Sequence, residues 1–353
     1  MEGAETTSLC LPIRGAGSFK DRDYLETGEK LVFCVVGEIH PPGRVFAYLK
    51  YVLGEAKPNR VLRFYSVPHV EETMKLLAQK HPEYLFEDPY SGLRFPAVPL
   101  SKIKTHYKPE EGLSRIRASP KDVLEEKAAR LAELLAERAG VPLGRFGITG
   151  SILLGIHNLA YSDIDLIVYG LRESLKVKEA LLSLYGEAES RVQRFSGGKL
   201  KAWCEEKSKL HPLTFEEALE IYRRTWNRGI FEGTVFSVHP VQADYEVAER
   251  YGGKRFKARE VVEGEAYIED ASHSIFLPAV YKVRNVKVRG KSLEEVLKLV
   301  SFEGLYGGIF TEGERVRFRG LLEEVEDLKL NRVYWRVLIG SRAAKGHDYI
   351  KPC

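Results

Sequence analysis

The chain has 353 residues, of which 44% are hydrophobic and 29% are charged, so it can bury a substantial core and is too long for one average domain. Its 54 Lys and Arg residues nearly balance its 50 Asp and Glu residues, and the net charge of +4 excludes a protein that coats nucleic acid through bulk charge. Any anionic partner must therefore be bound by a local patch of cations.

Composition also indicates where the protein works. No apolar run approaches the roughly 18 to 20 residues that cross a bilayer, and the first residues lack the basic and then apolar pattern of an export signal. The four cysteines are far apart, which excludes a CxxC metal motif and a dense disulfide framework. We expect a soluble, cytoplasmic protein with no membrane partner. Few Met, Gln and Asn residues beside abundant Glu, Lys and Arg favour a source that grows hot.

Residues 1–115 predict a strand-rich N-terminal domain. The segments 31–36 and 45–51 are rich in β-branched and aromatic residues, and the turn-forming residues 40–43 separate them. A short helix is expected over 71–79, followed by an irregular stretch that prolines interrupt.

Residues 116–250 predict a central domain in which helices and strands alternate. The residues Ser-Pro-Lys-Asp at 119–122, with the serine as the capping residue, are typical of a helix start, and Gly140 is typical of its end. Thr214 and Glu217 have the spacing of a capping box, which predicts a helix running to Trp226. The other expected elements are a loop or short strand at 145–149, helices over 151–157 and 173–185, and strands over 163–169 and 234–241.

Residues 251–353 predict a β-rich C-terminal domain whose sequence indicates no chemistry. One helix is expected in it, over 293–300. Its expected strands are 266–268, 274–283, 286–288, 315–319 and 333–339. The absence of internal repeats and low-complexity tracts from the sequence argues against a solenoid or a disordered scaffold.

Two acids at the head of an apolar strand indicate the chemistry. Asp163 and Asp165 are two residues apart, so both carboxylates face the same side of the expected sheet. Each carboxylate raises the pKa of the other, and a bound divalent cation removes that cost. Oxygen ligands alone suit Mg²⁺ or Mn²⁺. We therefore expect Asp163 and Asp165 to be metal ligands.

A Gly-Ser pair precedes the two acids at the start of an expected helix. Gly150 has no side chain and allows a phosphate to approach the backbone, and Ser151 adds a hydroxyl and free amides at a helix N-terminus. With the acids, the pair describes a site for a metal-bound nucleoside triphosphate. The chemistry of such a site is two-metal attack on an α-phosphate, to which the protein contributes positioning and electrostatics.

On these residues the chain resembles the nucleotidyltransferase superfamily of DNA polymerase beta. That signature begins with a hydrophobic residue, then a Gly, and then either Gly or Ser. After a gap it continues with an Asp, a hydrophobic residue, either Asp or Glu, and another hydrophobic residue. Thr149-Gly150-Ser151 and Asp163-Ile164-Asp165-Leu166 match it, with threonine as a loose match. Most of the chain is also similar to uncharacterised archaeal proteins described as predicted nucleotidyltransferases. The resemblance implies an α+β fold with a polymerase-beta-like nucleotidyltransferase core flanked by strand-rich N- and C-terminal domains.

The resemblance also implies a third acid on a later strand, where it ligates the metal that activates the acceptor hydroxyl. The matching strand here, 234–241, offers Ser237 and His239 but no acid. Asp244 lies just beyond the strand and completes the catalytic site if the chain curls back. The alternative is that His239 takes the place of the acid, in a site that is altered or silent.

The segment from Arg191 to Arg228 is the local basic patch, with nine Lys or Arg and five Glu. Arg223, Arg224 and Arg228 precede the strand 234–241, so they are candidates for nucleotide binding, and the two tryptophans of the segment can stack on a base. The alternative is that the cations end a helix favourably and the indoles pack in the core.

These features predict a Mg²⁺-dependent nucleotidyltransferase that moves a nucleoside monophosphate from an NTP to a hydroxyl of an RNA end, a protein or a small molecule. Its catalytic residues would be Asp163, Asp165 and Asp244. The alternative is a catalytically silent module on the same core that binds a nucleotide, or RNA through the basic patch. We expect the flanking domains to choose the acceptor. Acceptor, base preference and oligomeric state stay open.

Overall fold

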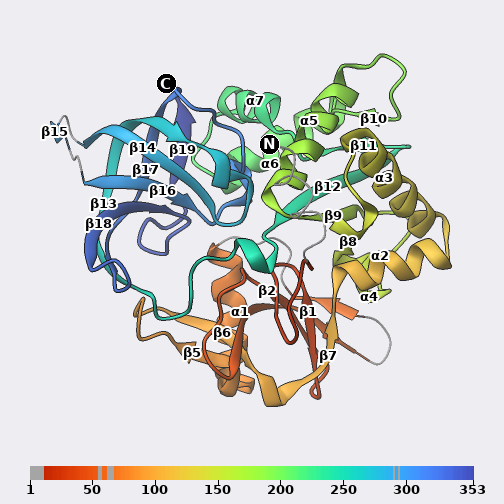
Figure 1. The fold of residues 1–353 in the computed structure, drawn as a ribbon, viewed down its shortest axis with the longest axis horizontal. Coiled ribbons are helices and arrows are strands. Elements are labelled where there is room, and N and C mark those ends of the chain that lie inside the picture. Colours follow the sequence, from red (N-terminus) through yellow and green to blue (C-terminus); the bar gives the residue numbers. More distant parts are fainter. Residues whose placement is uncertain (1–11, 55–57, 62–66, 289–290, 293–294) are drawn as a thin grey trace, which may run out of the picture.

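The computed structural model describes residues 12–54, 58–61, 67–288, 291–292 and 295–353. The protein is a mixed α/β structure with three sheets, whose strands lie within residues 24–107, 146–241 and 254–352 (Figure 1). The predicted boundary at residue 115 falls within helix α2 (Pro109–Ala118), which packs on a strand of the second sheet.

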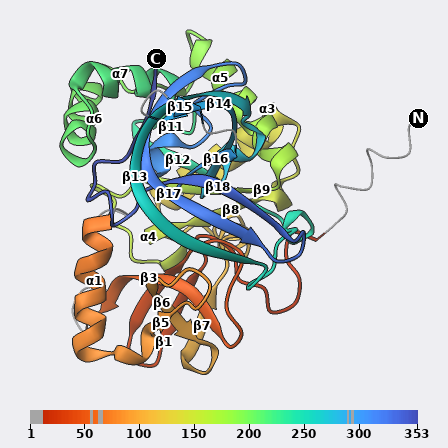
Figure 2. The same cartoon turned by 90° about the vertical axis from the view of Figure 1, so that its left-hand side faces the viewer.

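The first sheet has the strand order β5-β6-β3-β2-β1-β7, with β4 paired to β3. Its elements are β1 (Tyr24–Thr27), β2 (Leu31–Val35), β3 (Arg44–Leu53), β4 (Pro58–Arg60), helix α1 (Val67–Lys80), β5 (Leu85–Glu87), β6 (Arg94–Pro99) and β7 (Ile103–Tyr107). The strands predicted over 31–36 and 45–51 are confirmed as β2 and β3, and the helix predicted over 71–79 lies within α1. Figure 2 shows α1 beside this sheet.

Strand alternation gives the first sheet two different buried faces. Phe33 and Leu49 belong to a core that includes Leu77 of α1. On the opposite face, Cys34 and Tyr48 are paired across β2 and β3, and both belong to the core of the second sheet. The first sheet therefore packs between its own helix and the central part of the molecule.

The second sheet has the order β10-β11-β12-β9-β8, in which only the β9–β12 pair is parallel. Its strands are β8 (Phe146–Thr149), β9 (Ile164–Tyr169), β10 (Val192–Gln193), β11 (Arg228–Phe231) and β12 (Thr234–Val241). The helices of this region are α2, α3 (Val123–Ala139), α4 (Gly150–Leu154), α5 (Leu171–Gly186), α6 (Gly197–Leu210) and α7 (Phe215–Arg224). The predicted strands over 163–169 and 234–241 and the helix over 173–185 are confirmed as β9, β12 and α5.

The helix ends correct three predictions. Asp122, not Ser119, caps α3, because its carboxylate accepts from the amides of residues 124 and 125, whereas Ser119 ends α2. The predicted helix over 151–157 stops at residue 154, because Gly155 adopts φ +68°. The capping box of Thr214 and Glu217 is confirmed, but α7 ends at Arg224, before the predicted Trp226.

The third sheet closes on itself. Its strands β13 (Lys254–Asp270), β14 (Ala279–Val288), β16 (Val296–Ser301), β18 (Arg332–Ile339) and β17 (Arg315–Asp327) pair in this order, and β17 pairs with β13 to complete a five-stranded barrel. Strand β15 (Lys291–Ser292) pairs with β14, and β19 (Tyr349–Pro352) pairs with β17.

The helix predicted over 293–300 is wrong where the structure describes that segment, because residues 296–301 form β16. This strand lies between β14 and β18 and buries Val296, Leu299 and Val300. Packing within a closed barrel overrides the helical propensity of the Leu-Glu-rich sequence. Residues 293–294 lie outside the described part of the chain.

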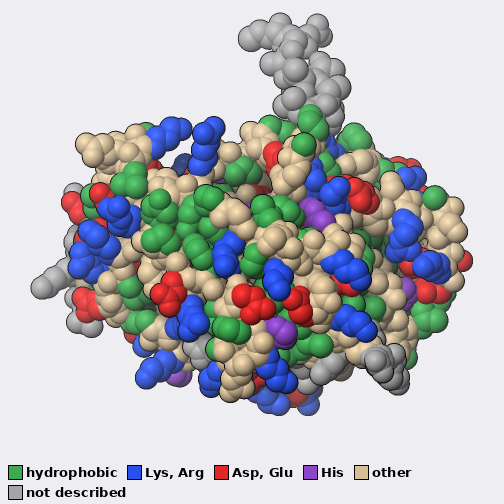
Figure 3. Space-filling model, turned by 90° about the horizontal axis from the view of Figure 1, so that it is seen from below, with side chains coloured by type: hydrophobic (Ala, Val, Ile, Leu, Met, Phe, Trp, Pro, Cys, Tyr) green, Lys and Arg blue, Asp and Glu red, His purple; other side chains and the backbone are tan. Residues whose placement is uncertain are grey.

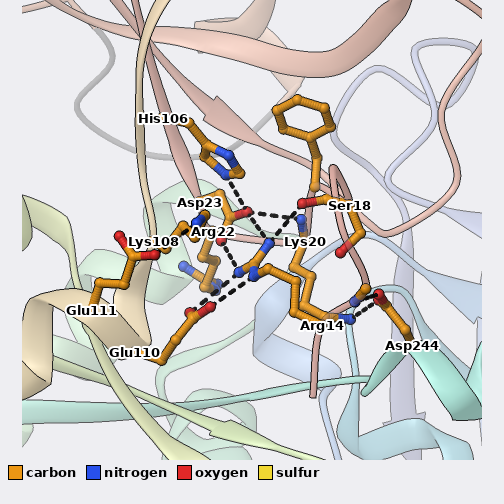
Figure 4. Close-up of polar contacts among 12 residues, drawn as sticks. Arg14, Ser18, Lys20, Arg22, Asp23, His106, Lys108, Glu110, Glu111 and Asp244 are labelled. Carbon is orange, nitrogen blue, oxygen red and sulfur yellow. Dashed lines mark hydrogen bonds and ion pairs between the residues drawn. The ribbon is translucent and has the colours of Figure 1, made fainter. Parts of the chain in front are cut away.

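A buried ion-pair network centred on Arg14 connects the first sheet to the second (Figure 4). The Arg14 guanidinium donates to both oxygens of Asp23 at 2.6 and 2.8 Å and to both oxygens of Glu110 on α2 at 2.7 and 3.2 Å. Asp23 is fully buried and also lies 2.7 Å from His106 Nε2. Glu110 accepts from the Tyr169 hydroxyl of β9 at 2.8 Å. Bidentate pairing satisfies both acids, which makes this burial of charge tolerable.

The close approach of α2 to β8 gives a stability prediction. A Cβ added at Gly147 would lie 2.6 Å from Pro109 Cβ and 2.8 Å from the Pro109 carbonyl carbon, whereas one at Gly144 would meet no atom within 4 Å. We expect Gly147→Ala to lower the free energy of unfolding by about 1–3 kcal/mol through overpacking. The control Gly144→Ala should change it by no more than about 0.5 kcal/mol. Equal melting temperatures of the two variants would contradict this packing.

Candidate functional site

The centre of the site is a row of residues across the second sheet. Asp165 on β9 is paired with Thr149 on β8 and with Ser237 on β12, and Ser237 is paired with Arg228 on β11. Four strands thus bring two hydroxyls, a carboxylate and a guanidinium to one level of the sheet. Thr149 also donates to the carbonyl of Arg22 at 2.8 Å, which links this row to the first sheet.

The two oxygens of the Asp165 carboxylate have different surroundings. Its Oδ1 accepts a hydrogen bond from the Ser237 hydroxyl and lies 3.4 Å from Nε2 of His239. His239 Nε2 is also 2.7 Å from Ser237 Oγ, so the three groups form one chain of contacts. The other oxygen of Asp165, Oδ2, faces the backbone of Gly150. Ser237 and His239 therefore orient Asp165 and leave one oxygen directed at the Gly-Ser turn.

Gly150 is required where it stands for two independent reasons. Its φ is +70°, a conformation that L-residues with side chains rarely adopt. A Cβ at this position would lie 2.7 Å from Asp165 Oδ2. The turn from β8 into α4 therefore places bare backbone against the carboxylate. Next to it, Ser151 Oγ lies 3.4 Å from Ser162 Oγ, so the hydroxyl of Ser151 lies near the chain that leads into β9.

The two acids differ in their tendency to ionise. The charge of Asp165, and then burial, raises the pKa of Asp163 to about 6, although Arg228 and Arg60 oppose this shift. Burial alone would raise the pKa of Asp165, but hydrogen bonds from His239 and Ser237 and the charge of Lys50 lower it to below its ordinary value. Asp165 is therefore the acid of the pair that stays ionised, and Asp163 is the acid whose ionisation is costly.

His239 is neutral at pH 7. Burial, and then the charge of Arg22, lowers its pKa to about 4, although Asp165 opposes this shift. Its side chain is only 16% exposed. The contact between His239 and Asp165 is therefore a neutral hydrogen bond rather than an ion pair, and it supports the carboxylate without neutralising it.

Cations from three parts of the chain surround the two acids. Arg22 and Lys50 act electrostatically on Asp165, and Arg60 and Arg228 act on Asp163. Three of them, Arg22, Lys50 and Arg60, come from the N-terminal region, which the sequence assigned no part in the site. A lysine within an otherwise apolar strand, 45–51, was the signal that could have indicated Lys50.

Asp244 is not brought to the two acids. Strand β12 runs parallel to β9, with Ser237 level with Asp165 and Val241 level with Tyr169, which displaces Val241 by roughly 13 Å along the strands. Asp244 follows Val241, pairs with the buried ammonium of Lys20 and accepts from the amide of Gly15. The chain does not curl back, because these contacts hold Asp244 at the other end of the strand.

The structure also places Arg223 and Arg224 away from the acids. Arg223 lies 3.5 Å from Glu220, and Arg224 pairs with Glu220 at 3.0 Å and with Glu314 beside the barrel at 2.7 Å. Of the candidate arginines, only Arg228 reaches the row. The tryptophans of the basic patch, Trp203 and Trp226, are 9% and 1% exposed, so of the two alternatives the structure supports packing of the indoles in the core rather than stacking on a base.

The carboxylates of Asp163 and Asp165 are the donors that this site offers to a divalent ion. Among the described residues, no group of three or more His, Cys, Asp or Glu side chains is arranged to hold a metal. Mg²⁺ commonly binds through one or two carboxylates and completes its shell with waters and substrate phosphates. Asp163 and Asp165, beside the bare backbone of Gly150, fit that requirement. Within the described ranges, no helix has the length and apolar character needed to span a membrane.

The fold and the site define a mixed α/β protein with a paired-carboxylate centre, and comparison with known proteins places it in a family. The chain is 31% identical over 342 residues to the uncharacterized protein MJ1086 of the archaeon Methanocaldococcus jannaschii, and the alignment covers 94% of this chain and 98% of the relative. The chain therefore belongs to the same family as that protein. No family model and no solved structure matches it.

The raised pKa of Asp163 predicts how stability depends on pH. Because the folded-state pKa is about 6 and the ordinary value is 3.8, the native state binds more protons than the unfolded state between these values. The metal-free protein should lose stability through this group as pH rises across that interval. We expect Asp163→Asn to raise the melting temperature at pH 7.5 and to have little effect at pH 3.5, measured by scanning calorimetry.

Magnesium should remove the advantage in melting temperature that Asp163→Asn has over the wild type at pH 7.5. Addition of Mg²⁺ at pH 7.5 should stabilise the wild type and leave Asp163→Asn unchanged, because only the wild type has both ligands. A variant that is destabilised equally at both pH values would show that Asp163 is not under repulsion in the native state.

Two glycines offer a matched test of the close approach of the Gly150 backbone to Asp165. Gly150 and Gly155 both have positive φ, +70° and +68°, so alanine at either should cost about 1–2 kcal/mol in backbone strain. Only at Gly150 would the new Cβ meet Asp165; at Gly155 it meets no atom within 4 Å. We expect Gly150→Ala to weaken Mg²⁺ binding by roughly 10- to 100-fold, measured by calorimetric titration, and Gly155→Ala to leave it unchanged. Equal affinities in the two variants would contradict the assignment.

Proposed function

We propose that this protein is a Mg²⁺-dependent nucleotidyltransferase, which moves a nucleoside monophosphate from an NTP to a hydroxyl acceptor. The observation that carries the proposal is the contact between the turn at Gly150 and the carboxylate of Asp165. It joins the two halves of the predicted motif, which are separate in the sequence, into one place where a phosphate chain can meet two acids.

The arrangement of elements supports the same proposal. Strand β8 leads through Gly150 and Ser151 into α4, the two acids lie at the head of β9, and β12 lies beside β9. This is the order of features that the resemblance to the polymerase beta superfamily implies. The later strand is present and adjacent, although it contributes Ser237 where the superfamily has an acid.

The residues of the chain have distinct parts in the proposed reaction. Asp163 and Asp165 would hold the Mg²⁺, which supplies charge neutralisation for the phosphates when it is bound. The bare backbone of Gly150 admits the phosphate chain to the acids. Ser237 and His239 are positioning residues, since they hold Asp165 Oδ1 and keep Oδ2 directed at the turn. The acceptor oxygen bonds to the α-phosphorus as the bond to pyrophosphate breaks, pyrophosphate leaves with the electron pair of that bond, and the hydroxyl gives its proton to solvent water.

A silent nucleotide-binding module is the second candidate, and one observation favours it. Strand β12 places Ser237 level with Asp165 and His239 level with Ile167, and it presents no carboxylate there. Binding of RNA through the basic patch has less support, because Arg191, Arg194 and Arg224 are engaged by Glu232, by backbone carbonyls and by Glu314. Figure 3 shows a different face, that of the first sheet, and there too cations and acids are interspersed.

Transfer of label from α-phosphate-labelled NTPs tests the function directly. The reaction would contain Mg²⁺ or Mn²⁺ at elevated temperature, with RNA and protein from a matched extract as acceptors. We expect labelled product with the wild type and none with the Asp163→Ala, Asp165→Ala double variant. Asp270→Ala removes an acid that pairs with Lys282 at the barrel and should retain full transfer.

The outcomes separate the two candidates. Product that depends on the two acids would establish a nucleotidyltransferase and identify the acceptor class. Mg²⁺-dependent binding of NTP without transfer would favour the silent module. Transfer that survives loss of both acids would refute the proposed site.

A further inference from the structure

We propose that Lys50, supplied by strand β3 of the first sheet, binds the phosphate chain of the nucleotide in the central site. This inference rests on the proposed function, because it assumes that a nucleoside triphosphate lies against Asp163 and Asp165. It assigns a part of the nucleotide site to the N-terminal region, where the sequence indicated only a strand-rich domain.

The position of Lys50 follows from a β-bulge in β3 and from the rings beside its ammonium. Val32 is paired with Tyr51 and Phe33 with Leu49, so Lys50 is the extra residue of the bulge. Its ammonium lies over the rings of Tyr24 and Tyr51, which both belong to the core of the second sheet. Across the sheet, Tyr48 is paired with Cys34, and Cys34 is paired with Tyr24. This is the face that packs toward the second sheet, and the charge of Lys50 reaches Asp165 from it.

Lys50 does not behave as a structural counter-ion. A buried lysine that compensates a carboxylate normally forms a direct ion pair with it. The Lys50 ammonium instead lies 5.5 Å from the centroid of the Tyr24 ring and 5.9 Å from that of Tyr51, and it forms no ion pair with a carboxylate among the described residues. Oδ1 of Asp165 already accepts from Ser237. Lys50 is therefore held by aromatic faces near an acid with which it forms no direct ion pair.

The charges around Lys50 indicate that an anion would stabilise its ammonium. Arg22 and Arg60 both act repulsively on Lys50, and burial disfavours its charged form. Arg22 pairs with Asp21 at 3.5 Å, whereas Lys50 forms no ion pair with a carboxylate among the described residues, and a buried ammonium in that position is costly unless an anion joins it. A triphosphate would supply that anion next to the two acids that hold its metal. The same contact would stabilise the charge that builds up on the departing pyrophosphate as the bond to the α-phosphorus breaks.

Binding measurements with matched variants test this assignment. The probes are each of the four NTPs and inorganic tripolyphosphate, all with Mg²⁺. Lys50→Met keeps the length of the side chain and removes the charge, and Lys50→Arg keeps the charge. Lys104→Met is the control, since Lys104 lies on β7 of the same sheet and is 64% exposed. We expect Lys50→Met to weaken binding of NTP and tripolyphosphate alike by about 10- to 100-fold, Lys50→Arg to restore part of it, and Lys104→Met to change nothing.

Two further measurements keep the test decisive. The melting temperature of ligand-free Lys50→Met should equal or exceed that of the wild type, because the repulsion among the cations is reduced. Reductive methylation of the wild type, read by mass spectrometry, should modify Lys50 in the free protein and spare it when MgATP is bound, with Lys104 modified in both states. This second measurement needs no variant to fold.

The outcomes distinguish this inference from the proposed function. Wild-type binding of tripolyphosphate in Lys50→Met, or methylation of Lys50 that bound nucleotide does not reduce, would overturn the inference even if the wild type transfers nucleotides. Loss of binding in Lys50→Met with no transfer by the wild type would support it and refute the transferase. Failure of the wild type to bind any of the probes would overturn both.

Discussion

Repulsion between Asp163 and Asp165 is the constraint around which the centre of the molecule is organised. Two carboxylates at the head of one strand cannot both ionise cheaply without positive charge beside them. Ser237 and His239 stabilise the charge on Asp165 by hydrogen bonds, and Asp163 is left with a raised pKa. The remaining compensation comes from cations, among them Arg228 on a neighbouring strand. The repulsion that remains at Asp163 is what a divalent ion would relieve under the proposed function.

The first sheet supplies part of that positive charge where it packs against the second. Its face toward α1 is an ordinary apolar core, and its other face carries tyrosines, a cysteine and Lys50 toward the acids. Arg14 holds the two sheets in this arrangement by pairing with Asp23 on one side and Glu110 on the other. The N-terminal domain, which the sequence led us to regard as a selector of acceptors, thus forms part of the wall of the site. Selection of the acceptor stays a proposal for both flanking domains.

Local patterns predicted the elements near the site well. The apolar strands β9 and β12 and the capping box of Thr214 are encoded by neighbouring residues, and the structure confirms each of them. Predictions were wrong where distant packing decides the outcome. Residues 296–301 are a strand because the barrel needs one between β14 and β18, and Trp226 is buried because the chain turns inward after α7. Neither fact is present in the local sequence.

By itself, the sequence determined the chemical identity of the site, because Gly150, Asp163 and Asp165 act through properties that a short segment encodes: a missing side chain and two carboxylates on one face of a strand. Tertiary structure alone decided which other residues join them. The parallel register of β9 and β12 sets Ser237 beside Asp165 and carries Asp244 to the opposite end, and the docking of the first sheet brings Lys50 to the acids. These contacts join residues more than 70 positions apart, and they depend on strand register and on packing between sheets.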